Sequence, residues 1–183
     1  MRSLWRPLFL APFVLAVGLA SLSGMEAQDD AMRFSLPDAS GVEVRLEDLQ
    51  GRFVLLYFFS LDRTADRQGA QVLEEQIWGR YRELGVRVCG VGVDATVSEV
   101  RRFVEVSGVS YPVLADTREV ARTFCAGGGD LSRAMTVLLA ENEGIVYRGS
   151  GYDGAAIVSE LRKRSLATEV DESTWGKVKE LFR

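Results

Sequence analysis

The sequence predicts an α/β fold of three layers, in which helices cover both faces of a mixed central sheet. Two runs of strand length are typical of strands buried on both faces: Phe53–Phe59, which is continuously apolar, and Val86–Val93, which is rich in β-branched residues. Helical patterns follow these runs, which indicates parallel strands joined by crossover helices. Two further strands, at 136–139 and 145–148, are separated only by a turn and therefore add an antiparallel hairpin.

A small β-hairpin is expected before the first long strand. Apolar and polar residues alternate between 34 and 46 on both sides of a turn cluster at 38–41. One helical turn closed by Gly51 follows, and the strand at 53–59 comes directly after it. The hairpin is thus an N-terminal addition to the predicted sheet.

The first long helix is predicted to run from about Asp66 to a C-cap at Gly85. Apolar residues recur along it at helical spacing, so we expect one face to be directed to the core. The residues of this face are Leu73, Ile77, Trp78, Tyr81 and Leu84.

Three more helices are predicted after the strand at 86–93. A capping box at Thr96 opens a helix that ends at Gly108, with Val97, Val100 and Val104 on one side. A short extended piece at 111–114 leads to a helix that Asp116 or Thr117 caps. That second helix is expected to bury Val120, Ala121 and Phe124, and a third helix at 155–166 ends the domain.

The two ends of the chain lie outside the predicted domain of residues 32–166. Residues 1–27 place two arginines before an apolar run at 8–20, which is typical of a secretory signal peptide, with a short membrane anchor as the alternative. The mature protein is then expected to be extracytoplasmic, that is periplasmic or secreted, with membrane contact only through an uncleaved N-terminal segment. Residues 167–183 carry three apolar residues at helical spacing and predict an amphipathic extension.

Composition excludes several kinds of function. A net charge of −4 and a pI near 5.1 provide no basic field for nucleic acid. The chain has no histidine, which excludes a histidine general base, Ser-His-Asp and Cys-His catalysis, and histidine-ligated metals. No cofactor or metal site is predicted, and Cys89 and Cys125 are the only thiols.

Four segments in this order resemble the redoxin branch of the thioredoxin superfamily. They are FSLPDASGVEVRLEDLQGRFVLLYFFS at 34–60, GVRVCGVGVDAT at 85–96, YPVLADTREVARTF at 111–124 and GIVYRGSGY at 144–152. The two most similar subgroups are the extracytoplasmic TlpA-type thiol–disulfide reductases and the peroxiredoxins of the alkyl hydroperoxide reductase/thiol-specific antioxidant family. The resemblance covers about residues 32–165 and implies a thioredoxin-like three-layer fold.

The resemblance places the family's active site in the loop after strand 53–59, where the expected cysteines are missing. The C-x-x-C positions of the reductases fall on Arg63 and Asp66, and the peroxidatic cysteine of the peroxiredoxins falls on Arg67. Thr64 matches the peroxiredoxin threonine, but Ser60 stands at the proline position. None of these side chains can replace a thiolate nucleophile.

A third family feature, a cis-proline before the closing hairpin, is also absent. Ala134 lies at or near that position. A cis bond before a non-proline residue costs about 2.5–4 kcal/mol, so a trans peptide is expected there. The combined losses indicate a site that has stopped performing redox chemistry.

The two remaining thiols leave an alternative open. Cys89 lies inside a strand, where cysteine usually behaves as a small buried hydrophobe. Cys125 ends a helix close to the loops, where the negative potential of the helix terminus raises a thiol pKa. A disulfide between Cys89 and Cys125 is conceivable if their Cα atoms come within about 7 Å.

The charges of the degenerate loop suggest a binding function. Asp62, Arg63, Asp66 and Arg67 lie where the amides of a helix N-terminus would meet a ligand, so an anionic group or a partner's acidic side chain could be held there. The alternative is an exposed cluster that pairs with itself.

Three hypotheses follow. The first is an exported redoxin-like domain that is degenerate for thiol catalysis and acts by binding or scaffolding toward an unknown protein or small-ligand partner. The second is an active thiol–disulfide oxidoreductase or antioxidant peroxidase that uses Cys125, Cys89 or both. The third is a small-ligand binder that uses the charged loop after strand 53–59.

Overall fold

The computed structural model describes residues 33–49, 51–117, 119–125, 132–141 and 144–165. All of them belong to one compact unit, Met32–Arg183. The predicted signal peptide or anchor at 1–27 and the predicted extension at 167–183 lie outside the described residues.

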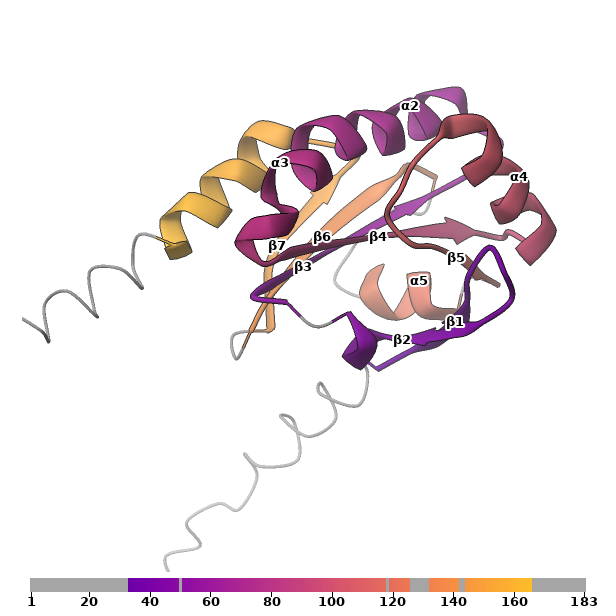
Figure 1. Cartoon of the computed structure of the whole chain (residues 1–183), viewed down its shortest axis with the longest axis horizontal. Coiled ribbons are helices and arrows are strands. Elements are labelled where there is room, and N and C mark those ends of the chain that lie inside the picture. The colour runs from indigo at the N-terminus through magenta and orange to yellow at the C-terminus, as the bar shows by residue number, and fades with distance from the viewer. Residues whose placement is uncertain (1–32, 50, 118, 126–131, 142–143, 166–183) are drawn as a thin grey trace, which may run out of the picture. The chain divides into compact units, whose positions relative to one another are not determined.

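A five-stranded mixed sheet forms the centre of the domain (Figure 1). Its strand order is β5-β4-β3-β6-β7, with β3, β4 and β5 parallel and β6 and β7 antiparallel to their neighbours. The strand bounds are β3 Phe53–Phe59, β4 Val86–Val93, β5 Val113–Asp116, β6 Met135–Ala140 and β7 Gly144–Ser150. The mixed sheet is therefore confirmed, although β5 begins two residues later than the extended piece predicted at 111–114.

The central strand β3 is buried along its whole length. It pairs with β4 from Phe53↔Val86 to Phe59↔Gly92, and with β6 on its other side. Because both faces of the sheet are covered, every position of β3 faces a packed layer, which explains its unbroken apolar sequence.

Helices lie on both sides of the sheet, as predicted (Figure 1). One core cluster joins the sheet to α2 (Thr64–Leu73), to α4 (Val97–Ser107) and to the last helix at 154–165. A second cluster joins the opposite face to α5 (Glu119–Cys125) and to the N-terminal hairpin. The three-layer α/β/α arrangement is confirmed.

The segment after β3 is a single irregular helical region. α2 passes into the π-helical turn η2 (Glu74–Trp78), then into α3 (Gly79–Tyr81) and the 3₁₀ turn η3 (Arg82–Leu84). Gly85 then ends it with φ of 83°, a left-handed conformation that favours glycine. The helix begins at Thr64 instead of about Asp66, because Arg63 serves as its N-cap without a side-chain capping bond.

The predicted core-facing stripe of this region is correct for four of its five residues. Leu73 and Ile77 are buried, and Trp78 and Tyr81 pack partly buried against the same cluster. Leu84 was wrongly assigned to the core, because its exposed fraction is 66%. The π turn and the closing 3₁₀ turn change the residues per turn, so an ideal helical period no longer places Leu84 toward the sheet.

The capping box of α4 is confirmed. Thr96 Oγ1 accepts a hydrogen bond from Glu99 N at 3.4 Å, and Thr96 N donates to Glu99 Oε2 at 2.8 Å. Val100 and Phe103 are the buried residues of this helix, whereas Val97 and Val104 are only half-buried. Gly108 ends α4 with φ of 70°.

At the start of α5, Asp116 and not Thr117 supplies the capping carboxylate. Its two oxygens accept hydrogen bonds from the backbone N–H groups of Val120 at 3.2 Å and Ala121 at 2.8 Å. Ala121 and Phe124 are buried as predicted, while Val120 is half-buried.

The N-terminal hairpin is confirmed as β1 (Ser35–Pro37) paired antiparallel with β2 (Glu43–Arg45). The 3₁₀ turn η1 (Leu46–Asp48) follows it and ends at Leu49, before the glycine predicted to close it. Asp38 Oδ1 accepts hydrogen bonds from two turn amides, and Asp38 also forms an isolated antiparallel bridge with Leu114 of β5. The hairpin therefore lies beside the outer edge of β5.

Candidate functional site

The loop after β3 and the first turn of α2 form the candidate site. β3 ends at Phe59, and Ser60–Arg63 lead directly into α2 at the carboxyl end of the parallel strands. In α/β sheets this end is where ligands and reactive groups gather, because loops and helix N-termini converge there. The structure thus places Arg63, Asp66 and Arg67 in the region where the sequence predicted the site.

Arg63 and Asp66 hold each other in a partly buried ion pair. Arg63 Nε donates to Asp66 Oδ2 at 2.8 Å, and the second guanidinium contact, from Nη2, is also 2.8 Å long. The same carboxylate oxygen accepts the backbone N–H of Ser60 at 3.1 Å. Asp66 is only 8% exposed, so its charge is compensated inside the protein and not by water.

Arg63 also connects the helix start to the loop before β6. Its Nη1 donates to the backbone carbonyl of Ser132. Ala134, two residues further on, is 2% exposed, and its carbonyl accepts the Gly151 N–H at 2.6 Å. No cis peptide bond occurs in the described part of the chain, so the bond before Ala134 is trans, as expected.

Arg67 folds back on its own loop. Its guanidinium donates to the Leu61 carbonyl, and to Thr64 Oγ1 at 3.1 Å. The backbone N–H of Arg67 donates to Arg63 O at 3.1 Å, which continues the helix. Arg67 is thus a structural part of the loop, and three of its five guanidinium N–H donors have no acceptor among the described residues.

The two thiols lie away from this loop in the chain, and only one side chain is described. Cys89 is a free cysteine, fully buried in β4 among residues of the cluster that faces α5 and the hairpin. Burial raises the pKa of the Cys89 thiol well above its ordinary value, which disfavours the thiolate. Cys125 ends α5, and its side chain lies outside the described part of the structure.

Among the described residues, cavities lie beside the candidate site and at the N-terminal hairpin. A groove of about 650 Å³ lies between α2 and α4, and a small cavity of about 140 Å³ lies between the Ser60–Arg63 loop and residues 93–95. The groove contains Asp62, Thr64 and Arg67 from the candidate site, together with Arg102 and Phe103 from α4. The sequence does not indicate that residues of α4 belong to this groove, because their position next to α2 depends on the order of the strands in the sheet.

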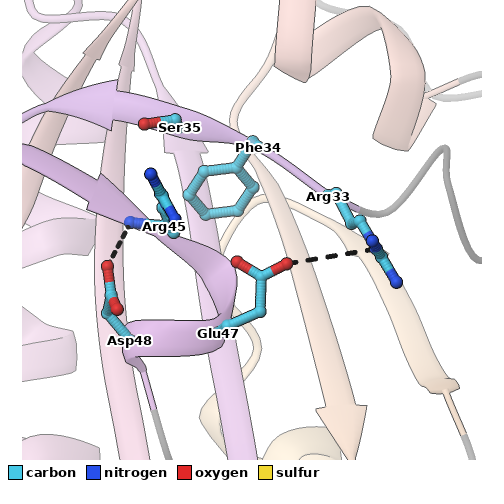
Figure 2. Close-up of a pocket in the computed structure, with 6 residues that line it drawn as sticks. All are labelled: Arg33, Phe34, Ser35, Arg45, Glu47 and Asp48. Carbon is cyan, nitrogen blue, oxygen red and sulfur yellow. Dashed lines mark hydrogen bonds and ion pairs between the residues drawn. The ribbon is translucent and has the colours of Figure 1, made fainter.

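The third cavity, of about 430 Å³, belongs to the N-terminal hairpin (Figure 2). Figure 2 shows Glu47 extending toward Arg33, whose Nε lies 4.0 Å from Glu47 Oε1. Asp48 Oδ2 accepts the backbone N–H of Arg45 at 2.9 Å. The acidic side chains of this cavity are therefore engaged by groups of the hairpin itself.

The described ranges have neither the features of a metal centre nor those of a membrane-spanning helix. No group of histidine, cysteine, aspartate or glutamate side chains there has the arrangement of a metal site. No helix of that same part of the chain combines the length and the apolar character needed to cross a bilayer.

Known proteins share both the sequence pattern and the fold. The model of the AhpC/TSA family matches residues 27–148. The thiol-disulfide oxidoreductase ResA of Halalkalibacterium halodurans is 31% identical over 98 residues, which cover 53% of this chain and 54% of that protein. Peroxiredoxin Bcp of Escherichia coli is 30% identical over 95 residues, covering 52% of this chain and 60% of that protein. The chain therefore spans less than two thirds of the length of either relative.

A solved structure gives the same fold. The crystal structure of peroxidoxin BcpB from Mycobacterium tuberculosis superposes with a TM-score of 0.60 at 23% identity, covering 72% of this chain and 92% of that one. The thioredoxin-like architecture implied by the sequence resemblance is confirmed.

Proposed function

This chain belongs to the AhpC/TSA family and carries an arginine–aspartate ion pair at the two positions that the resemblance to the thiol–disulfide reductases assigns to the C-x-x-C cysteines, so we propose that it is a redoxin-fold protein that works by binding. The observation that carries the proposal is the contact between Arg63 and Asp66, with two guanidinium–carboxylate distances of 2.8 Å. In this ion pair the guanidinium and the carboxylate neutralise each other's charge, so the site is filled by groups that already have partners.

Thiol exchange and peroxide reduction both need a thiolate that attacks a sulfur or an oxygen. Arg63 and Arg67 remain protonated and hold no electron pair for such an attack. Asp66 Oδ2 accepts hydrogen bonds from Ser60 N and Arg63, so its charge is committed to the loop. The site supports ligand contact through its outer side chains and gives no route to redox turnover.

The N-terminal segment supports an extracytoplasmic location for this binding. Two arginines followed by the apolar run at 8–20 have the order of a signal peptide. We place the domain outside the cytoplasm, where a free, buried Cys89 is protected from disulfide exchange by the sheet around it.

Turnover assays test the proposal. Purified protein lacking residues 1–27 is expected to reduce neither hydrogen peroxide nor an organic hydroperoxide with a thiol donor, and to leave insulin disulfides intact. A known peroxiredoxin and a known thioredoxin serve as positive controls under the same conditions. Robust turnover by this protein in either assay would overturn the proposal.

A second function, thiol–disulfide exchange or peroxide reduction through Cys125, is favoured by the names of the two sequence relatives. Cys89 is fully buried in β4, so Cys125 at the end of α5 is the candidate thiol for this alternative. In that case Cys125→Ser abolishes the activity seen in the turnover assays, whereas Cys89→Ser retains it. Activity that survives both substitutions would exclude this alternative.

A further inference from the structure

The groove between α2 and α4 has the size of a small-ligand site. Its volume of about 650 Å³ falls in the range of roughly 300–1,000 Å³ that is common for such sites. The two helices follow the parallel strands β3 and β4, so both start at the same edge of the sheet, and residues of both line the groove. Eleven residues line the groove: Leu61, Asp62, Thr64, Arg67, Gln68, Gln71, Glu99, Arg102, Phe103, Val106 and Ser107.

Charges of opposite sign follow one another along the groove. Asp62 lies just before α2 and Glu99 lies in the first turn of α4, whereas Arg102 lies about one turn further along α4. The Arg67 guanidinium is directed back to Leu61 and Thr64 at the start of α2. On α4 the carboxylate and the guanidinium are three residues apart, an axial rise of about 4.5 Å. A ligand lying between the helices therefore meets a negative zone and then a positive zone about one helical turn away.

Several of these polar groups have no partner among the described residues. The carboxylate of Asp62, the guanidinium of Arg102 and the amides of Gln68 and Gln71 form no hydrogen bond or ion pair within that part of the chain. Glu99 uses Oε2 for the capping box, while hydrogen bonds to Thr96 hold its pKa below the ordinary value and keep it charged. Opposite charges thus share one groove without neutralising each other.

The walls of the groove also offer an apolar surface and one orphan hydroxyl. Phe103 is 7% exposed beneath the groove, and Val106 on its rim is 81% exposed, which is unusual for a large apolar side chain in this domain. Ser107 Oγ is the buried side-chain oxygen for which the described residues provide no hydrogen-bond partner. Buried polar atoms in native proteins normally have a hydrogen-bond partner. A polar ligand group that enters beside Val106 would supply the missing partner of Ser107 Oγ.

We propose that the groove between α2 and α4 binds a small zwitterion with an apolar side chain, the chemistry shared by a free amino acid and a dipeptide. The ammonium group pairs with Asp62 and Glu99, the carboxylate pairs with Arg102, and the side chain lies on Phe103 and Val106. A polyanion is repelled by the two carboxylates and a simple cation by the two guanidiniums. This inference rests on the proposed binding function, since it gives that function a ligand.

Isothermal titration calorimetry with four probes tests the ligand class. L-phenylalanine and L-phenylalanyl-L-leucine carry both charges, N-acetyl-L-phenylalanine lacks the ammonium group, and L-phenylalanine amide lacks the carboxylate. We expect at least one zwitterion to bind, and each singly charged analogue to bind about tenfold more weakly or worse, because one charge-assisted pair is lost. The zwitterion with the lower dissociation constant shows whether the groove prefers a free amino acid or a dipeptide.

Two substitutions assign the charges, each with a matched control. Arg102→Gln is expected to weaken zwitterion binding about tenfold or more and to remove the discrimination against the amide. Asp62→Asn is expected to weaken zwitterion binding by a similar factor and to remove the discrimination against N-acetyl-L-phenylalanine. Arg122→Gln on α5 and Glu105→Gln on α4 change exposed charges outside the groove and should leave binding unchanged. Circular dichroism and urea midpoints establish that all four variants are folded.

The outcomes separate this inference from the proposed function. Absence of zwitterion binding, equal binding of all four probes, or unchanged affinity in Arg102→Gln would overturn the inference. If the same preparation shows no peroxide or disulfide turnover, the proposed function stands without this ligand. If it shows turnover, the proposed function fails, and the titration still decides whether the groove binds zwitterions.

Discussion

At the scale of single residues, Asp66 holds the candidate site together. One oxygen of its carboxylate joins the end of β3, through Ser60 N, to the first turn of α2, through Arg63. Arg63 carries the connection onward to Ser132 before β6. Three chain segments thus depend on one partly buried charge.

We expect Asp66→Ala to lower the free energy of unfolding by about 1–3 kcal/mol, because it leaves the Ser60 amide and the Arg63 guanidinium without their acceptor. Urea denaturation at pH 7 measures the effect. Asp62→Ala is the matched control: its carboxylate is exposed and pairs with no described residue, so its effect should stay within about 0.5 kcal/mol. Equal effects at the two positions would contradict the described role of Asp66.

Cys89 is expected to be unreactive in the folded protein. In a Cys125→Ser variant, where Cys89 is the sole thiol, Ellman's reagent should detect almost no thiol in the native state and one thiol after denaturation. Burial raises the thiol pKa, so the neutral form persists and raising the pH from 7 to 9 should not increase native reactivity. Rapid native labelling that increases with pH would show an accessible thiolate instead.

At the scale of elements, α2 approaches the sheet closely at one glycine. A Cβ at Gly69 would lie 2.3 Å from the hydroxyl oxygen of Tyr57, which is buried and donates to the Asp66 carbonyl at 3.2 Å. Because the Tyr57 ring is held between the sheet and α2, it cannot move away at little cost. The glycine therefore sets how near α2 can lie to β3.

Gly69→Ala should destabilise the protein by about 1–3 kcal/mol, although the same change usually stabilises the interior of a helix. Tyr57→Phe removes the clashing oxygen, so Gly69→Ala should cost less in that background than in the wild type. A double-mutant cycle measured by urea denaturation gives the coupling. Additive effects would mean that the clash is relieved by movement elsewhere.

The capping box of α4 predicts a pH dependence. Hydrogen bonds from Thr96 lower the pKa of Glu99 below its unfolded value, so the stabilisation is present above about pH 4.5, the ordinary value. It is lost as the pH falls through the lowered folded pKa. Unfolding by urea should show Glu99→Gln less stable than wild type at pH 7, with a smaller difference at pH 3. A difference independent of pH would rule out the charge as its cause.

At the scale of the whole molecule, the N-terminal hairpin completes the layer that contains α5. Phe34 is 6% exposed and contacts Phe124 of α5 edge to face, with ring centroids 6.2 Å apart. Phe58 of β3 also packs on Phe124, at 5.4 Å. The hairpin, a helix and the central strand therefore meet at one aromatic ring.

Phe34→Ala is expected to lower the free energy of unfolding by about 3 kcal/mol, since it empties a packed aromatic site. Val42→Ala in the same hairpin is the control, because Val42 is 61% exposed and should change stability by less than about 0.5 kcal/mol. Urea denaturation of both variants and the wild type under the same conditions measures the changes in the free energy of unfolding. A small effect of Phe34→Ala would mean that the hairpin adds little to the stability of the domain.

Much of the fold could be predicted because local patterns and tertiary packing agree. The strands β3 and β4 have the predicted bounds, since both are apolar runs ended by polar residues, and the Thr96–Glu99 capping box marks the start of α4. The prediction that Leu84 faces the core is wrong, because no pattern in the sequence indicates the π-helical turn η2 that precedes it.

The contacts within the candidate site could not be predicted from the sequence. The sequence places Arg63 and Asp66 after β3, yet the bond from Arg63 to the Ser132 carbonyl joins residues 69 positions apart in the chain and follows from the antiparallel pairing of β3 with β6. The groove likewise depends on α2 and α4 lying on one face of the sheet. Long-range contacts of this kind leave no signal in the spacing of residues.

The ion pair between Arg63 and Asp66 bears on how easily a C-x-x-C motif could be introduced into this loop. A cysteine placed at position 63 alone removes the guanidinium and leaves a mostly buried carboxylate without its counter-charge. A cysteine at position 66 alone leaves Arg63 and the Ser60 amide without their acceptor. Each single substitution toward C-x-x-C is therefore expected to destabilise the loop, so an engineered C-x-x-C site would need both substitutions at once.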